Sequence, residues 1–93
     1  MEPAWYERGM PIYVCERTFS PAVTEQAFAE GGKALGPCLA ARDVRHLASH
    51  LATDGTRCVC LFEAADAEAV REANRTAGLP FDKVWATNVY SSG

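Results

Sequence analysis

The fold is decided by the stretch Asp54-Gly55-Thr56-Arg57-Cys58-Val59-Cys60-Leu61-Phe62-Glu63. Asp-Gly is a strong signal for a tight hairpin turn when strand-like segments flank it. The residues from 57 to 63 alternate as a strand does, with Cys58, Cys60 and Phe62 on one face and Val59 and Leu61 on the other. A strand after this turn needs a partner before it, and residues 45–52 are the only candidate.

Residues 43–53 also have a helical pattern, because Val44, Leu47, Ala48 and Leu51 follow the spacing of one helix face. Periodicity alone slightly favours this helix, with Asp43 as its cap and Gly55 as its stop. The hairpin turn favours a strand over residues 45–52 instead. We therefore expect a strand there.

The other elements have clear local signals. Residues 12–18 alternate as a strand. A helix is expected to begin at Ser20-Pro21, or one turn later at Thr24-Glu25, and to end at Gly36-Pro37. Gly31-Gly32 weakens this helix by roughly 1 kcal/mol per glycine relative to alanine.

The second half of the chain has a second helix and a last strand. Asp66 is placed to cap the helix, Gly78 to end it in the left-handed conformation, and Pro80 to prevent its continuation. The last strand is expected within residues 82–90. The order β-α-β-β-α-β predicts an α+β, ferredoxin-like split β-α-β plait: a four-stranded antiparallel sheet with two helices on one face. The open face needs a cover, and a second copy of the chain would provide one, so a homodimer is expected.

Length and composition restrict the class of protein. The chain of 93 residues has 48% hydrophobic and 23% charged residues and a net charge of −3, which is ordinary for one globular domain. We expect an N-terminal extension over residues 1–9, the domain over residues 10–90 and a flexible tail over residues 91–93. An acidic chain without a basic cluster weighs against nucleic acid, and no apolar run is long enough for a membrane span. A cytoplasmic location is expected, where the four cysteines would be free thiols, metal ligands or a redox pair.

Several motifs together resemble a known family. They are Pro11-Ile12-Tyr13-Val14 with Glu16-Arg17-Thr18-Phe19, then Cys60-Leu61-Phe62-Glu63-Ala64, Glu68-Ala69-Val70-Arg71 and Ala77-Gly78-Leu79-Pro80-Phe81-Asp82-Lys83-Val84. In this order and spacing they are similar to short bacterial ferredoxin-like proteins of otherwise unknown function, some of which bind nickel. The resemblance implies a dimeric ferredoxin-like protein with nickel or another transition metal as a ligand, and a strand at residues 45–52. It also implies that Cys60 occupies the family's common cysteine position, whereas many relatives have histidine where this chain has Asn74.

The cysteines are the first candidates for a metal site. Cys58 and Cys60 point to the same side of one strand, with Cα atoms roughly 6.5–7 Å apart, so both can approach one soft ion. Cys15 lies on the adjacent strand. If Ile12, Val14, Val59 and Leu61 face the helices, the three thiols share the open face, where they would suit Cu(I), Zn(II) or Ni(II). The alternative is that they are small buried hydrophobic residues.

The two histidines are further candidates. On a strand, His46 and His50 point the same way but lie about 13 Å apart, so at most one joins a given site. A two-residue turn at Asp54-Gly55 pairs Ser49 with Cys60 and His50 with Val59, which places the histidines opposite the cysteine face. A bulged three-residue turn reverses that arrangement.

Our first hypothesis is a transition-metal binding protein, of the nickel type, for sequestration or sensing, and nickel, copper and zinc are its candidate metals. Its candidate ligands are Cys60 and Cys58, followed by His50, Cys15 and His46. The second hypothesis is a small dimeric α/β-barrel-like enzyme, a cofactor-independent oxygenase or cyclase, with His50 or Tyr13 in an apolar pocket between sheet and helices. A third is a partner-binding module that uses the open sheet face.

Overall fold

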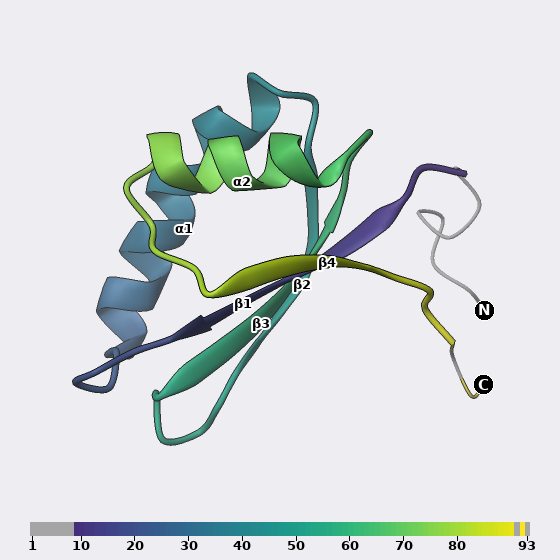
Figure 1. Ribbon diagram of the computed structural model, residues 1–93. Coiled ribbons are helices and arrows are strands. Elements are labelled where there is room, and N and C mark those ends of the chain that lie inside the picture. The colour runs from purple at the N-terminus through teal and green to yellow at the C-terminus, as the bar shows by residue number, and fades with distance from the viewer. Residues whose placement is uncertain (1–8, 91, 93) are drawn as a thin grey trace.

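The computed structural model describes residues 9–90 and 92 and places two helices on one side of a four-stranded sheet (Figure 1). The elements in chain order are β1 Ile12–Thr18, α1 Glu25–Ala40, β2 Arg45–Leu51, β3 Arg57–Glu63, α2 Ala67–Thr76 and β4 Lys83–Thr87. The strands lie in the order β2-β3-β1-β4, and every neighbouring pair is antiparallel. The predicted α+β class and element order are confirmed. Residues 1–8 of the expected extension and residues 91 and 93 of the expected tail lie outside the described residues.

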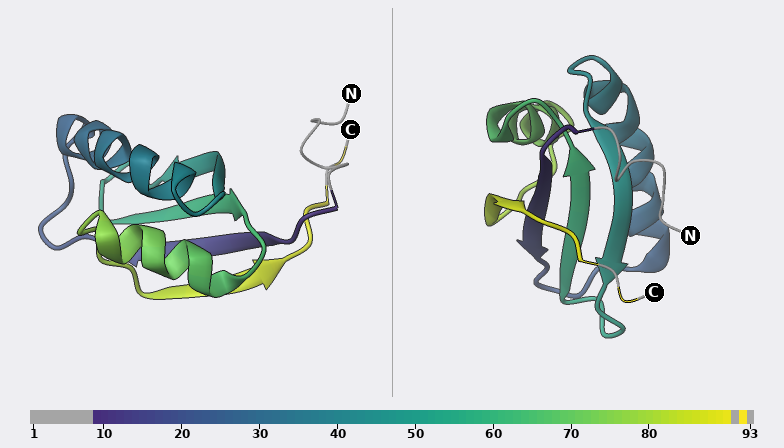
Figure 2. Two further views of the ribbon diagram at one scale, coloured as in Figure 1. Left: turned by 90° about the horizontal axis from the view of Figure 1, so that it is seen from above. Right: turned by 90° about the vertical axis from the view of Figure 1, so that its right-hand side faces the viewer.

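Both helices lie against the same face of the sheet (Figure 2), and the hydrophobic core combines residues of the sheet and of both helices. Strand β1 pairs Cys15 with Cys60 of β3 and with Val84 of β4, and all three side chains belong to the core. The helices contribute Leu35 and Leu39 from α1 and Val70 and Ala73 from α2. No helix in the described part of the chain is long and apolar enough to cross a membrane.

The condition for placing the cysteines on the open face, that Ile12, Val14, Val59 and Leu61 face the helices, is not met. Cys15, Cys58 and Cys60 are buried beneath the helices, and the face away from the helices carries Val59 and Leu61 instead. The alternation of β1 and β3 is ambiguous because both of their faces are largely apolar. The large Phe62 shares its face with the thiols, and burying that ring under the helices takes the cysteines with it.

Helix α1 begins at the later of the two predicted starts and extends beyond the predicted end. Thr24 is its N-cap, and its hydroxyl oxygen accepts a hydrogen bond from the amide of Ala27 at 3.1 Å. Pro37 lies inside the helix, so the predicted stop at Gly36-Pro37 is wrong. Proline removes one backbone donor, but burial of Leu39 against the core stabilises a further turn.

The hairpin and the second helix follow the sequence signals. Strand β2 confirms the strand prediction for residues 45–52. Gly55 has a φ of 75°, and a Cβ there would lie 2.6 Å from the carbonyl oxygen of Val23, so only glycine fits at this turn. Asp66 caps α2 and Gly78 follows it with a φ of 74°, as predicted. Strand β4 is shorter than the span in which it was expected.

Candidate functional site

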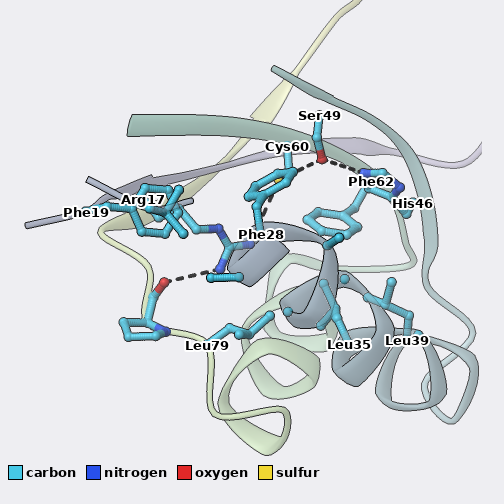
Figure 3. Close-up of a pocket in the computed structure, with 17 residues that line it drawn as sticks. Arg17, Phe19, Phe28, Leu35, Leu39, His46, Ser49, Cys60, Phe62 and Leu79 are labelled. Carbon is cyan, nitrogen blue, oxygen red and sulfur yellow. Dashed lines mark hydrogen bonds between the residues drawn. The ribbon is translucent and has the colours of Figure 1, made fainter. Parts of the chain in front are cut away.

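A cavity of about 430 Å³ lies between α1 and the sheet (Figure 3). Its walls are mainly apolar, with Phe19, Phe28, Leu35, Leu39, Phe62 and Leu79 among the residues that line it. Its polar side chains come from the three neighbouring strands: Arg17 from β1, His46 and Ser49 from β2, and Cys60 from β3. The site is therefore an apolar pocket with a polar group of residues on its sheet side.

A cluster of thiols surrounds Cys60 beneath this pocket. The Sγ atoms of Cys58 and Cys60 are 3.5 Å apart. Nη2 of Arg17 lies 3.6 Å from Sγ of Cys15 and 4.0 Å from Sγ of Cys60. All four cysteines of the chain are free thiols. The guanidinium therefore contacts the sulfurs of Cys15 and Cys60, and Cys58 joins the cluster through Cys60.

Ser49 connects Cys60 to His46. The Ser49 hydroxyl lies 3.1 Å from Sγ of Cys60 and 2.7 Å from Nε2 of His46. The imidazole is also 5.5 Å from the ring of Phe62, centroid to centroid. These contacts form a hydrogen-bonded chain along the pocket wall, which is visible as the dashed lines beside Ser49 in Figure 3.

A β-bulge separates the two histidines. Ser49 pairs with Cys60 and His50 with Val59, as a two-residue turn predicts. Between His46 and Ala48 the register shifts by one residue, so His46 pairs with Phe62 and lies on the helix side of the sheet. His50 points to the opposite face and is exposed. The expectation that both histidines point the same way is therefore wrong, and the cause is the bulge.

The environment separates the pKa values of the three clustered thiols. Burial raises the pKa of Cys60, but hydrogen bonding by His46 and Ser49 and the charge of Arg17 outweigh it and lower that pKa from 9.0 to about 7. Burial raises the pKa of Cys15 to about 11, against the opposing charge of Arg17. Burial and the neighbouring Cys60 raise the pKa of Cys58 to about 12. Cys60 is thus the thiol of this cluster that ionises near neutral pH.

Arg17 and Ser49 are site residues that the sequence reasoning did not select. Arg17 donates to Oδ1 of Asn74 at 2.9 Å and to the carbonyl of Pro80 at 3.2 Å. Asn74 is completely buried and donates in turn to the carbonyl of Val70. Arg17 shares a strand face with Cys15, and the predicted hairpin register already pairs Ser49 with Cys60, so strand parity could have indicated both residues.

The predicted ligands are only partly brought together. Cys15, Cys58, Cys60 and His46 lie on the helix side of the sheet, whereas His50 does not. Within the described residues, no group of three or more His, Cys, Asp or Glu side chains is placed to hold a metal ion. A pocket between sheet and helix does exist, as the enzyme hypothesis requires, but its imidazole is His46, and neither His50 nor Tyr13 lines it.

These observations define a small α+β protein with a thiol cluster and an apolar pocket under its helices. Residues 13–86 match the family described as nickel responsive protein SCO4226-like, and the chain belongs to this family. The crystal structure of SCO4226 from Streptomyces coelicolor A3(2) is similar, with a TM-score of 0.78 at 16% sequence identity, and the match covers 86% of this chain and 99% of that one. No curated protein matches the chain significantly. The structural similarity shows the fold, and the family description supplies the reference to nickel.

Proposed function

We propose that this protein binds a transition-metal ion, of the nickel type, through Cys58 and Cys60, for sequestration or sensing in the cytoplasm. The observation that carries the proposal is the 3.5 Å separation of the two Sγ atoms. Two sulfurs bound to one ion at about 2.3 Å each lie on the order of 3.3–3.8 Å apart. The pair therefore has the spacing of a chelate without a movement of the backbone.

The chemistry of the donors supports the same two residues. Thiolate is the form of cysteine that binds metal, and the pKa of Cys60 near 7 provides it at neutral pH. The pKa of Cys58 near 12 means that its proton must be displaced by the ion. Binding should therefore release protons, and the affinity should fall as the pH decreases through 7.

His46 is the third ligand in this proposal. Its Nε2 atom is separated from Sγ of Cys60 only by the Ser49 hydroxyl, to which it is hydrogen-bonded at 2.7 Å. Breaking that hydrogen bond frees the imidazole for the ion. Cys15 is less suited, because the guanidinium of Arg17 lies 3.6 Å from its sulfur and would repel a cation bound there. His50 is omitted because it lies on the opposite face of the sheet.

The proposal includes a ferredoxin-like homodimer that forms through the sheet face away from the helices. Its support is that Trp85, at 44% exposure, lies on this face with the half-buried Leu61, on either side of the buried Val14. Burying the exposed indole and the apolar surface beside it at a dimer interface removes them from water, which is favourable.

The test is titration of the tag-free protein with Ni(II), Cu(I) and Zn(II), followed by isothermal calorimetry and the sulfur-to-nickel charge-transfer absorption. We expect about one ion per chain in the wild type, and loss of both signals in a Cys58→Ser, Cys60→Ser double variant. Cys38→Ser is the matched control, because Cys38 is a free thiol on α1 outside the cluster. His46→Gln should weaken binding and His50→Gln should not. Unchanged stoichiometry and affinity in the double variant would refute the assignment.

A further inference from the structure

The wall of the pocket along α1 includes two glycines, Gly32 and Gly36. Gly32 lies on the same helix stripe as Phe28, Leu35 and Leu39, at the i, i+4, i+7 and i+11 spacing of a core-facing surface. A Cβ atom at Gly32 or at Gly36 would meet no atom within 4 Å. Both glycines line the cavity of about 430 Å³ at exposed positions, and their lack of a side chain leaves this part of its wall open.

The space has the size and the lining of a small-molecule site. Pockets that bind small ligands are typically about 300–1,000 Å³ and mostly apolar, with a few polar groups that orient the ligand. The observed volume corresponds to roughly 14 water-sized groups. Its walls are aliphatic and aromatic, and its polar side chains gather on the sheet side.

Arg17 supplies the pocket with a buried positive charge. The residue is 6% exposed, and its guanidinium donates to the neutral oxygens of Asn74 and Pro80. It also lies 3.6 Å from Sγ of Cys15 and 4.0 Å from Sγ of Cys60, and Cys60 is the thiol that ionises near neutral pH. Within the described residues, no carboxylate contacts it. A buried guanidinium is strongly favoured by an anionic partner, and a carboxylate can accept two of its hydrogen bonds at once. The pocket is thus apolar along α1 and cationic at Arg17.

We infer that this pocket binds a small apolar molecule with one carboxylate group, whose carboxylate pairs with Arg17 and whose apolar part lies along the glycine-lined wall of α1. The inference does not depend on metal binding, since it uses the guanidinium and the cavity rather than the thiol pair.

The experiment compares three ligands of equal chain length: decanoate, decanol and decylamine. Each is titrated below its micelle concentration or, for decanol, below its solubility limit into the full-length, chelator-treated protein and followed by calorimetry. We expect decanoate to bind roughly ten- to a hundredfold more tightly than decanol, which is the range for a charge-assisted hydrogen bond, and decylamine to bind most weakly. Equal affinities for all three ligands, or no binding of any, would overturn the inference.

Two variant pairs locate the ligand. Arg17→Met should abolish the preference for decanoate over decanol, and Arg17→Lys should retain part of it. Gly32→Leu should fill the cavity and prevent binding of every ligand, whereas Gly32→Ala adds only a Cβ atom and should preserve it. If the Arg17 variants do not fold, the Gly32 pair decides alone: decanoate binding by Gly32→Leu with wild-type affinity would contradict the assigned site.

Discussion

The Ser49 hydroxyl should set the pKa of Cys60, and Ser49→Ala tests this. A hydroxyl has one proton and two lone pairs. When Ser49 donates that proton to the Cys60 thiolate at 3.1 Å, it can accept a hydrogen bond from Nε2–H of His46 at 2.7 Å. The hydrogen bonds from His46 to Ser49 and from Ser49 to Cys60 therefore stabilise negative charge on the sulfur. Removal of the Ser49 hydroxyl eliminates both of them.

The expected size of the effect follows from the energy of such hydrogen bonds. A hydrogen bond to a charged group contributes about 1.5–3 kcal/mol, and one pKa unit corresponds to about 1.4 kcal/mol. Ser49→Ala should therefore raise the pKa of Cys60 from about 7 by roughly 1–2 units, back towards its ordinary value of 9.0. His46→Gln should raise the pKa of Cys60 as well, by at least as much, because hydrogen bonding by His46 lowers that pKa more than hydrogen bonding by Ser49 does.

The assay is the pH dependence of iodoacetamide alkylation, with the labelled residue located by mass spectrometry. A Cys38→Ser background removes the thiol outside the cluster, and Cys15 and Cys58 stay protonated because their pKa values are about 11 and about 12. The pH midpoint is the useful measure, since a thiolate of higher pKa is also more nucleophilic and partly compensates the rate. His50→Gln, on the opposite face, is the matched control. A midpoint that stays near 7 in Ser49→Ala would refute the hydrogen-bonded chain.

Four further predictions concern stability and assembly. Because the pKa of Cys60 is depressed in the folded protein, it should increase the free energy of unfolding by about 2–3 kcal/mol above pH 9, and this contribution should be lost as the pH falls through 7. Urea unfolding at several pH values should show this increase, and Cys60→Ser should remove it. The raised pKa values of Cys15 and Cys58 have the opposite sign, so stability should decline as the pH rises from 9 towards 11–12, and a flat profile there would contradict their burial as thiols. Gly32→Ala should stabilise the protein by about 0.5–1 kcal/mol, because it improves helix propensity and meets no atom within 4 Å; a lower urea midpoint would show that the position is not open. Trp85→Lys should convert the proposed dimer to a monomer in sedimentation velocity, and a monomeric wild type would contradict the dimer.

The fold could be predicted where the signals are local. Asp66 and Gly78 act as expected. The hairpin has the predicted register, but its turn differs, because Gly55 N–H donates to the carbonyl of Ala52 and the pair Ala52–Arg57 closes a four-residue loop. The end of α1 could not be predicted in this way. Proline normally stops a helix, but Leu39 beyond Pro37 is buried by the tertiary fold, and that contact is not visible in the local sequence.

The site was harder to predict because it depends on the direction in which each strand faces. Choosing Cys58 and Cys60 from the sequence finds the thiol pair, but it places them on the wrong side of the sheet. The bulge between His46 and Ala48 then puts His46 and His50 on opposite faces of the sheet, although their spacing in the sequence predicts the same face. A shift of a single residue reverses every later side chain in a strand, so strand periodicity cannot distinguish His46 from His50.

The pair Gly31-Gly32 can be interpreted either as a weak point in the helix or as part of the wall of a pocket. As a matter of propensity, glycine in α1 only weakens the helix, by about 1 kcal/mol per residue relative to alanine. In the folded chain these residues line the pocket, and a Cβ at Gly31 would already contact Leu79 at 3.5 Å. The helix is nevertheless retained, because Phe28, Leu35 and Leu39 pack on both sides of the gap. A weak helix segment bordered by such apolar residues and facing a buried arginine is therefore better interpreted as the wall of a binding site than as a defect in the helix.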